Sequence, residues 1–239
     1  METLNTHSPI QSIILHLLPG ALGTVTYVLL APGVLRNGYP AILALLIAVG
    51  IVTLPIQLGY LLTKRKTSVP LIALREPLPT WQYIVFPLLM VFWAFLASGA
   101  LSVLDVAIAK VWFNWLPEWF FIFDAEQFKA FSREALMTTF WIGLVVNGIA
   151  GPIVEELYFR GHLLPRLPGP RAWSPVFNIA LFSLYHFWTP WQVISRILWL
   201  LPWGYVVMKK KNIYLMMIAH CAGNTIGWFL TWALILGSK

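Results

Sequence analysis

Residues 135–160 read ALMTTFWIGLVVNGIAGPIVEELYFR, an apolar segment that ends in two adjacent glutamates and an arginine. About 20 mainly apolar residues are enough for a helix to cross a bilayer. The stretch therefore predicts a membrane span that carries Glu155, Glu156 and Arg160 near one end. Ionisable side chains at membrane depth cost several kcal/mol, so three of them together indicate a functional site.

The composition of the whole chain is that of a polytopic membrane protein. Of its 239 residues, 59% are hydrophobic and 10% are charged, whereas soluble domains have roughly 25% charged residues. We therefore expect an all-α transmembrane bundle forming a single membrane domain over residues 1–239, multi-pass in the cell membrane. The net charge of +7 resides in short loops between apolar runs, which favours contact with anionic lipid over a nucleic-acid partner. The lone Cys221 excludes a disulfide framework or a cysteine-based metal cluster.

Seven apolar runs are long enough to predict spans, and one aromatic stretch separates the third from the fourth. The predicted spans are residues 13–35, 39–62, 81–109, 135–159, 173–188, 191–208 and 213–236. Residues 111–131, VWFNWLPEWFFIFDAEQFKAF, place tryptophan and phenylalanine rings around Asp124, Glu126 and Lys129. Aromatic rings mixed with charge suit the headgroup level of a membrane. This stretch predicts an interfacial helix that acts as an anchor or as a lid.

The basic residues of the loops predict the orientation of the chain. An odd number of spans places the two termini on opposite sides of the membrane. The loops on the N-terminal side hold Lys64, Arg65, Lys66, Arg75, Arg166, Arg171, Lys209, Lys210 and Lys211, and those on the other side hold Arg36, Lys110, Lys129, Arg133 and Lys239. Because cytoplasmic loops carry the excess of Lys and Arg, the N-terminus is predicted to be cytoplasmic.

The polar residues of the spans form three motifs with helical spacing. Glu156 and Arg160 are four residues apart on one helix face, whereas Glu155 points about 100° away. Glu156 and Arg160 can thus compensate each other, which leaves Glu155 free to act. In later spans, His186 follows Phe182 by four residues, and Asn224 follows His220 by four.

This set of side chains matches what the hydrolysis of an acyl compound needs. A carboxylate and an imidazole can hold and deprotonate a water molecule, and His220 and Asn224 can donate hydrogen bonds to an oxyanion. No serine lies in a GxSxG elbow, and Cys221 points away from its neighbour His220, so activated water is favoured over a nucleophilic side chain. Each motif alone is more typical of helix packing. Their joint occurrence in spans that are otherwise poor in polar groups favours catalysis.

The three motifs, EELYFR at 155–160, FSLYH at 182–186 and HCAGN at 220–224, resemble those of the CPBP intramembrane proteases in identity and order. That family includes the type II CAAX endopeptidases, and the resemblance covers residues 138–232, the expected catalytic core. It implies that Glu155 and His186 activate water and that His220 and Asn224 stabilise the oxyanion, with Glu156 and Arg160 supporting the site. It also implies a peptide or lipidated-peptide substrate, in CAAX-type prenyl-protein processing or bacteriocin-related processing.

Several alternatives stay open at this point. Glutamate-activated water needs no cofactor and is the preferred mechanism, but Glu155, His186 and His220 could instead hold a zinc ion with an open position. The glutamates and histidines could also form the proton relay of a proton-coupled transporter. A non-catalytic immunity or scaffold membrane protein is the third possibility.

The predicted spans place the two water-activating residues at different depths. At 1.5 Å per residue, His186 lies roughly 20 Å along a span that starts at Trp173. Glu155 lies only roughly 8 Å from the end of its own span. We therefore expect offset, tilted or broken helices, or a water-filled cavity that joins the two residues.

Overall fold

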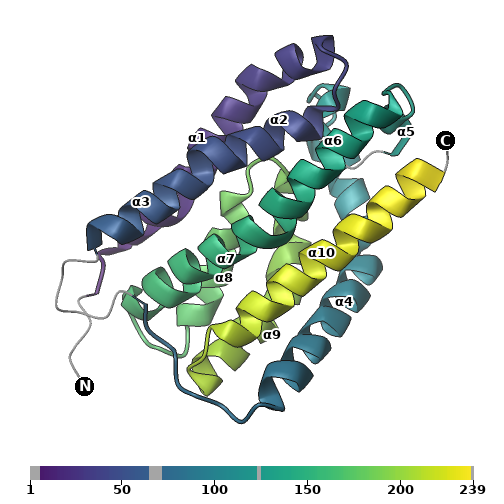
Figure 1. Ribbon diagram of the computed structural model, residues 1–239. Helices are drawn as coiled ribbons and strands as arrows, with labels where there is room; N and C mark the ends of the chain where they lie inside the picture. Colours follow the sequence, from purple (N-terminus) through teal and green to yellow (C-terminus); the bar gives the residue numbers. More distant parts are fainter. Residues whose placement is uncertain (1–5, 65–71, 123–124, 238–239) are drawn as a thin grey trace.

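The computed structural model describes residues 6–64, 72–122 and 125–237, and these residues form a helical bundle (Figure 1). Within these ranges there is no β-strand, apart from an isolated bridge between Arg75 and Asn212. The predicted all-α class is confirmed. Four residues used in the predictions above lie outside the described ranges: Arg65, Lys66, Asp124 and Lys239.

Four helical segments are long and apolar enough to cross a membrane, and they match the first four predicted spans. The first is α1 (Pro9–Arg36). The second joins α2 (Ala41–Ala48), the π-helical η1 (Val49–Thr53) and α3 (Leu54–Lys64). The third is α4 (Gln82–Trp112). The fourth covers residues 133–166 and joins α6 (Arg133–Gly143), the π-helical η3 (Leu144–Ala150), α7 (Gly151–Glu155), the π-helical η4 (Glu156–Leu163) and the 3-10 turn η5 (Leu164–Arg166).

The last three predicted spans correspond to one short helix and two longer ones. They are α8 (Ser174–Tyr185), α9 (Val193–Lys210) and α10 (Tyr214–Gly237), with the 3-10 turn η6 (Pro190–Gln192) before α9. The predicted span 173–188 is thus a helix of only 12 residues. It ends because His186 leaves the helical conformation, with φ −82° and ψ 58°. Pro190 then begins a new turn, and α9 packs back along α8.

Local side-chain chemistry sets several helix ends. The Ser8 hydroxyl accepts a hydrogen bond from the Gln11 backbone N–H at 3.2 Å and caps α1. Ser132 caps α6 in the same way through the Ala135 N–H at 3.1 Å. Such caps satisfy backbone donors that the first helical turn leaves unpaired. At the other end of a helix, Lys211 adopts the left-handed conformation, φ 49°, and terminates α9.

The aromatic stretch 111–131 differs from the single interfacial helix that we predicted. Its described residues form a 3-10 turn, η2 (Glu118–Phe120), and a four-residue helix, α5 (Ala125–Phe128). Pro117 directly precedes η2 and cannot donate a helical hydrogen bond. The stretch packs back onto the bundle: the Tyr27 hydroxyl donates to the Trp119 carbonyl at 3.2 Å, and Phe121 stacks on Trp191.

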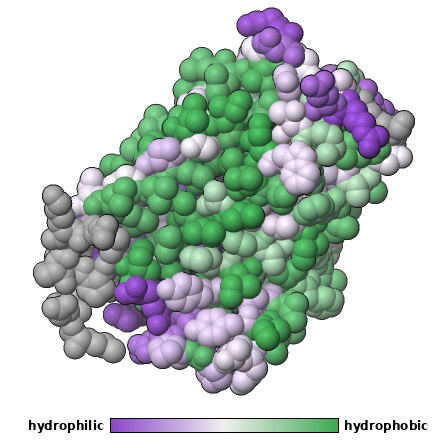
Figure 2. All heavy atoms as spheres, viewed as in Figure 1, coloured by the Kyte–Doolittle hydropathy of each residue, from purple (hydrophilic) through white to green (hydrophobic). Residues whose placement is uncertain are grey.

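The surface of the bundle suits a lipid environment. The first turn of α1 and the last turn of α10 lie at opposite ends of the molecule (Figure 1). Hydrophilic residues gather at these two ends, and a broad apolar belt lies between them (Figure 2). Many large apolar side chains of α1 and α4 are exposed, including Leu29, Leu88 and Phe92. Such a surface would be costly in water, so the chain is an integral membrane protein.

The continuous helix 133–166 removes the difference in depth that the sequence predicted. It does not end at Phe159 but runs on through η4 and η5, so Glu155 lies eleven residues before Arg166. At about 1.5 Å per residue this is roughly 16 Å. His186 follows the 12 residues of α8, roughly 18 Å from the start of that helix. The two residues can therefore meet at a similar depth.

Candidate functional site

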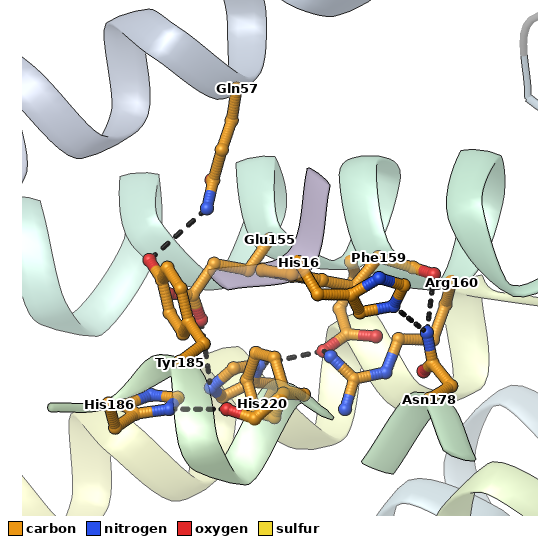
Figure 3. Close-up of polar contacts among 11 residues, drawn as sticks. His16, Gln57, Glu155, Phe159, Arg160, Asn178, Tyr185, His186 and His220 are labelled. Carbon is orange, nitrogen blue, oxygen red and sulfur yellow. Dashed lines mark hydrogen bonds and ion pairs between the residues drawn. The ribbon is translucent and has the colours of Figure 1, made fainter. Parts of the chain in front are cut away.

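One cavity of about 200 Å³ brings together the four residues predicted to be catalytic. Glu155 comes from the end of α7, His186 from the residue after α8, and His220 and Asn224 from α10. Figure 3 shows Glu155, His186 and His220 close to one another, although they lie in three separate parts of the chain. Leu45 of α2 contributes to the wall.

The carboxylate of Glu155 is buried and held by a chain of two hydrogen bonds. Its side chain accepts a bond from the Tyr185 hydroxyl at Oε1, 3.0 Å away, and that hydroxyl accepts one from Gln57 Nε2 at 3.1 Å (Figure 3). Oε2 faces His220 Nε2 at 3.9 Å. Neither Tyr185 nor Gln57 was predicted from the sequence. Tyr185 had one available signal, its place directly before His186 in the second motif.

Glu156 and Arg160 form the buried pair that their spacing predicted. Both side chains are fully buried, and Arg160 Nη1 lies 3.4 Å from Glu156 Oε1. The guanidinium also stacks over the Phe182 ring, 3.9 Å from its centroid. The same Oε1 of Glu156 lies 2.9 Å from Nδ1 of His220. Because a carboxylate accepts, Nδ1 of His220 carries a proton, and Glu156 fixes the orientation of that ring.

The tautomer of His186 follows from its backbone contact. Nδ1 lies 2.8 Å from the Phe182 carbonyl oxygen, which can only accept a hydrogen bond. Nδ1 therefore carries the proton, and Nε2 of the neutral ring is left as an acceptor. Phe182, Tyr185 and Trp188 surround the ring with centroids 4.7, 4.8 and 5.0 Å away. These aromatic contacts hold the imidazole in place.

Asn224 lies against the π-helical segment η3. Its Nδ2 donates to the Asn147 carbonyl at 2.9 Å, and the Thr225 hydroxyl donates to the Gly148 carbonyl at 3.3 Å. The wider turn of a π-helix leaves carbonyl oxygens open to such donors. The Asn224 amide has two N–H groups, so one remains for a ligand of the cavity.

The cavity also contains polar residues that the sequence analysis missed. They include Asn147 of η3 and Arg196 in the first turn of α9. Arg196 is buried, with 7% of its surface exposed. An arginine inside the predicted span 191–208 was the available signal, because charged residues at membrane depth usually have a function.

The three side chains considered as zinc ligands, Glu155, His186 and His220, all line this cavity. Among the residues described here, no group of three or more His, Cys, Asp and Glu side chains is arranged to hold a metal ion. The two histidines of the cavity have their Nδ1 atoms committed to Phe182 and Glu156.

A close contact between α1 and Tyr185 gives a first prediction. A Cβ atom added at Gly20 would overlap the carbonyl oxygen and the ring of Tyr185. We expect Gly20→Ala to lower the free energy of unfolding by about 1–3 kcal/mol, because overpacked sites must shift or strain. Gly33→Ala on the same helix is the matched control, since a Cβ there meets nothing within 4 Å. Thermal unfolding in detergent measures both, and equal stability of the two variants would contradict the close contact.

Comparison with known proteins identifies a related family. The family model described as type II CAAX prenyl endopeptidase Rce1-like matches residues 137–226. No curated protein and no solved structure matched the chain. The matched residues include all three sequence motifs and the four residues predicted to be catalytic.

Proposed function

We propose that this chain, a member of the CAAX-type intramembrane protease family by its match over residues 137–226, hydrolyses a peptide bond with an activated water molecule. In this proposal Glu155 and His186 activate the water, and His220 and Asn224 stabilise the oxyanion. Glu156 and Arg160 hold His220 in position. The observation that carries the proposal is the convergence of the four predicted residues on one cavity.

The protonation state of His186 supports its role in holding water. A water molecule can donate one hydrogen bond to the Glu155 carboxylate and one to Nε2 of His186. Glu155 then removes a proton as the water oxygen attacks the carbonyl carbon of the peptide bond. When the C–N bond breaks, the same carboxyl group returns that proton to the leaving amine. The Tyr185 hydroxyl binds the other oxygen of Glu155 and keeps the carboxylate oriented.

The oxyanion would bind on the α10 side of the cavity. The second N–H of the Asn224 amide is one donor, and its position is fixed by the bond to Asn147. His220 donates Nδ1–H to Glu156, so it can offer Nε2–H only when the ring is doubly protonated. Arg160 compensates the charge of Glu156, which is fully buried.

A neighbouring cavity supports a hydrophobic substrate. It has a volume of about 300 Å³ and shares Asn147, Gln192, Trp199, His220 and Asn224 with the candidate catalytic cavity. Four aromatic rings contribute to its walls, those of Phe95, Trp199, Trp203 and Trp228. Such walls would suit an apolar or prenylated peptide that approaches from the lipid. CAAX-type processing is the proposed role, and bacteriocin-related processing is the alternative within the same chemistry.

The orientation that we propose places the N-terminus in the cytoplasm and the chain in the cell membrane. Its support is the excess of Lys and Arg in loops on the N-terminal side, such as Arg75, Arg171 and Lys209. The continuous helix 133–166, which carries Glu155, ends on that same side.

The proposed activity is tested by cleavage of a prenylated CAAX-type peptide by the purified full chain, with products identified by mass spectrometry. We expect Asn224→Ala to lower kcat by about 10²–10³-fold, as is typical for the loss of one oxyanion donor. Asn37→Ala, at an exposed amide that ends α1, should leave kcat unchanged. Equal rates for the wild type and Asn224→Ala would contradict the assignment. Absence of cleavage together with Glu155-dependent proton flux into liposomes would favour a transporter.

A further inference from the structure

A buried arginine lines the candidate catalytic cavity without a carboxylate in contact. The Arg196 guanidinium donates to three neutral oxygens: Thr189 Oγ1 at 2.9 Å, Gln192 Oε1 at 2.8 Å and the Ser183 carbonyl at 3.4 Å. Within the described ranges, no Asp or Glu oxygen lies within 4.0 Å of it. A cation buried at membrane depth with only neutral partners is costly.

The carboxylates that act on Arg196 from further away have other partners. Asp105 and Glu155 interact with Arg196 through longer-range electrostatics. Asp105 of α4 accepts a hydrogen bond from the Ser195 hydroxyl at 2.6 Å, and Glu155 accepts one from Tyr185. A guanidinium has five N–H donors in a planar fork, so Arg196 can still bind an anion that enters the cavity.

We propose that Arg196 binds the C-terminal carboxylate of the peptide substrate and thereby selects peptides that are cleaved close to their free C-terminus. The inference rests on the proposed function, because it places a substrate in the same cavity. The planar fork of arginine matches a carboxylate and binds it with two parallel hydrogen bonds. The cavity of about 200 Å³ that holds Arg196 and Glu155 leaves room for only a short fragment between the carboxylate and the scissile bond.

The contacts of Arg196 connect this binding site to His186, which holds the water molecule in the proposed mechanism. Thr189 and Gln192 belong to the segment between α8 and α9, which begins with His186. The backbone N–H of Thr189 donates to the His186 carbonyl at 2.9 Å. An anion on the Arg196 guanidinium would therefore bind beside the segment that positions His186. The same contacts would therefore position both the C-terminal carboxylate of the peptide and the imidazole of His186.

The test compares three forms of one prenylated CAAX-type peptide with the purified full chain. The first form ends in a free carboxylate and the second in a carboxamide. The third also ends in a carboxamide, but its last residue is glutamate. We expect the wild type to favour the free acid over the plain amide by roughly 10- to 100-fold in kcat/KM, the usual effect of a hydrogen bond to a charged group. In Arg196→Gln, kcat/KM for the free acid should fall to the value for the amide. The value for the amide itself should change little. Arg171→Gln, at an exposed arginine outside the cavity, is the matched control and should keep the wild-type preference.

The outcomes separate the role of Arg196 from the proposed peptidase function. Equal cleavage of acid and amide by the wild type would overturn the inference and leave the proposed function standing, and this comparison needs no variant to fold. An equal loss on both peptides in Arg196→Gln would show that Arg196 is only structural. If the wild type cleaves the glutamate-ending amide as fast as the free acid, then Arg196 binds an acidic side chain. That result would overturn the proposed binding of the C-terminal carboxylate. Failure of the wild type to cleave any form would overturn the proposed function and this inference together.

Discussion

Replacing Glu155 by glutamine is expected to lower kcat for peptide hydrolysis by about 10³-fold, within the usual range for the loss of a general base. Glutamine has nearly the same shape and can still contact Tyr185, so the cavity should keep its structure and KM should change little. The amide cannot take a proton from water, however, which removes the chemistry that we propose for this residue. Steady-state kinetics with a prenylated peptide and a thermal unfolding curve measure both effects.

The control is Glu134→Gln, which changes an exposed glutamate in the first turn of the same continuous helix. It should match the wild type in activity and stability. Activity should also survive exhaustive chelation, because the proposed mechanism uses no metal. A loss of activity on chelation that zinc restores would make Glu155 a metal ligand instead of a base. Full activity of Glu155→Gln would remove it from the mechanism.

Replacing Arg160 by methionine is expected to lower the free energy of unfolding by about 3–5 kcal/mol. Arg160 is the cation that pairs with Glu156, and both side chains have no exposed surface. Methionine would leave Glu156 buried without its partner, and the stacking of the guanidinium on Phe182 would also be lost. Arg133→Met, at an exposed arginine of the same continuous helix, should cost less than about 0.5 kcal/mol.

The double variant Glu156→Gln, Arg160→Met separates charge from packing. It removes both charges, so it should regain part of the stability that the single variant loses. Recovery should be incomplete, because Glu156 also contacts His220. Unfolding by denaturant in detergent gives the free energies of all three proteins. A double variant that is less stable than Arg160→Met alone would contradict the account of a compensated pair.

The general architecture could be predicted because a long run of apolar residues is a strong signal for a membrane span. Runs of apolar residues predicted the helices now seen as α1, α2–α3, α4 and the segment 133–166, since a membrane span needs a minimum length. The same signal failed at α8. Its apolar run continues to Trp188, but the helix ends at Tyr185 because His186 turns back to place its ring beside Phe182. This end depends on tertiary contacts that composition does not reveal.

The candidate site could be predicted only in part, for a related reason. Charged and imidazole side chains are rare in the spans, so Glu155, His186 and His220 were conspicuous in the sequence. Gln57 and Asn147 are neutral, and their importance comes from partners far away in the chain, Tyr185 and Asn224. A spacing rule relates residues of one helix. It cannot show which helices will meet.

The number of residues in the π-helical segment η3 determines the direction in which the site carboxylates point. An i→i+5 turn holds one residue more than an α turn, so everything after η3 is rotated by about 100° relative to an uninterrupted α-helix. Glu155 follows η3 by only five residues, so its side chain is rotated by the same angle. An insertion or deletion within residues 144–150 would therefore act on the carboxylates themselves and turn them toward or away from the α10 side chains. Among homologous chains, a gap in this short segment would mark a change of active site, even where every motif residue is retained.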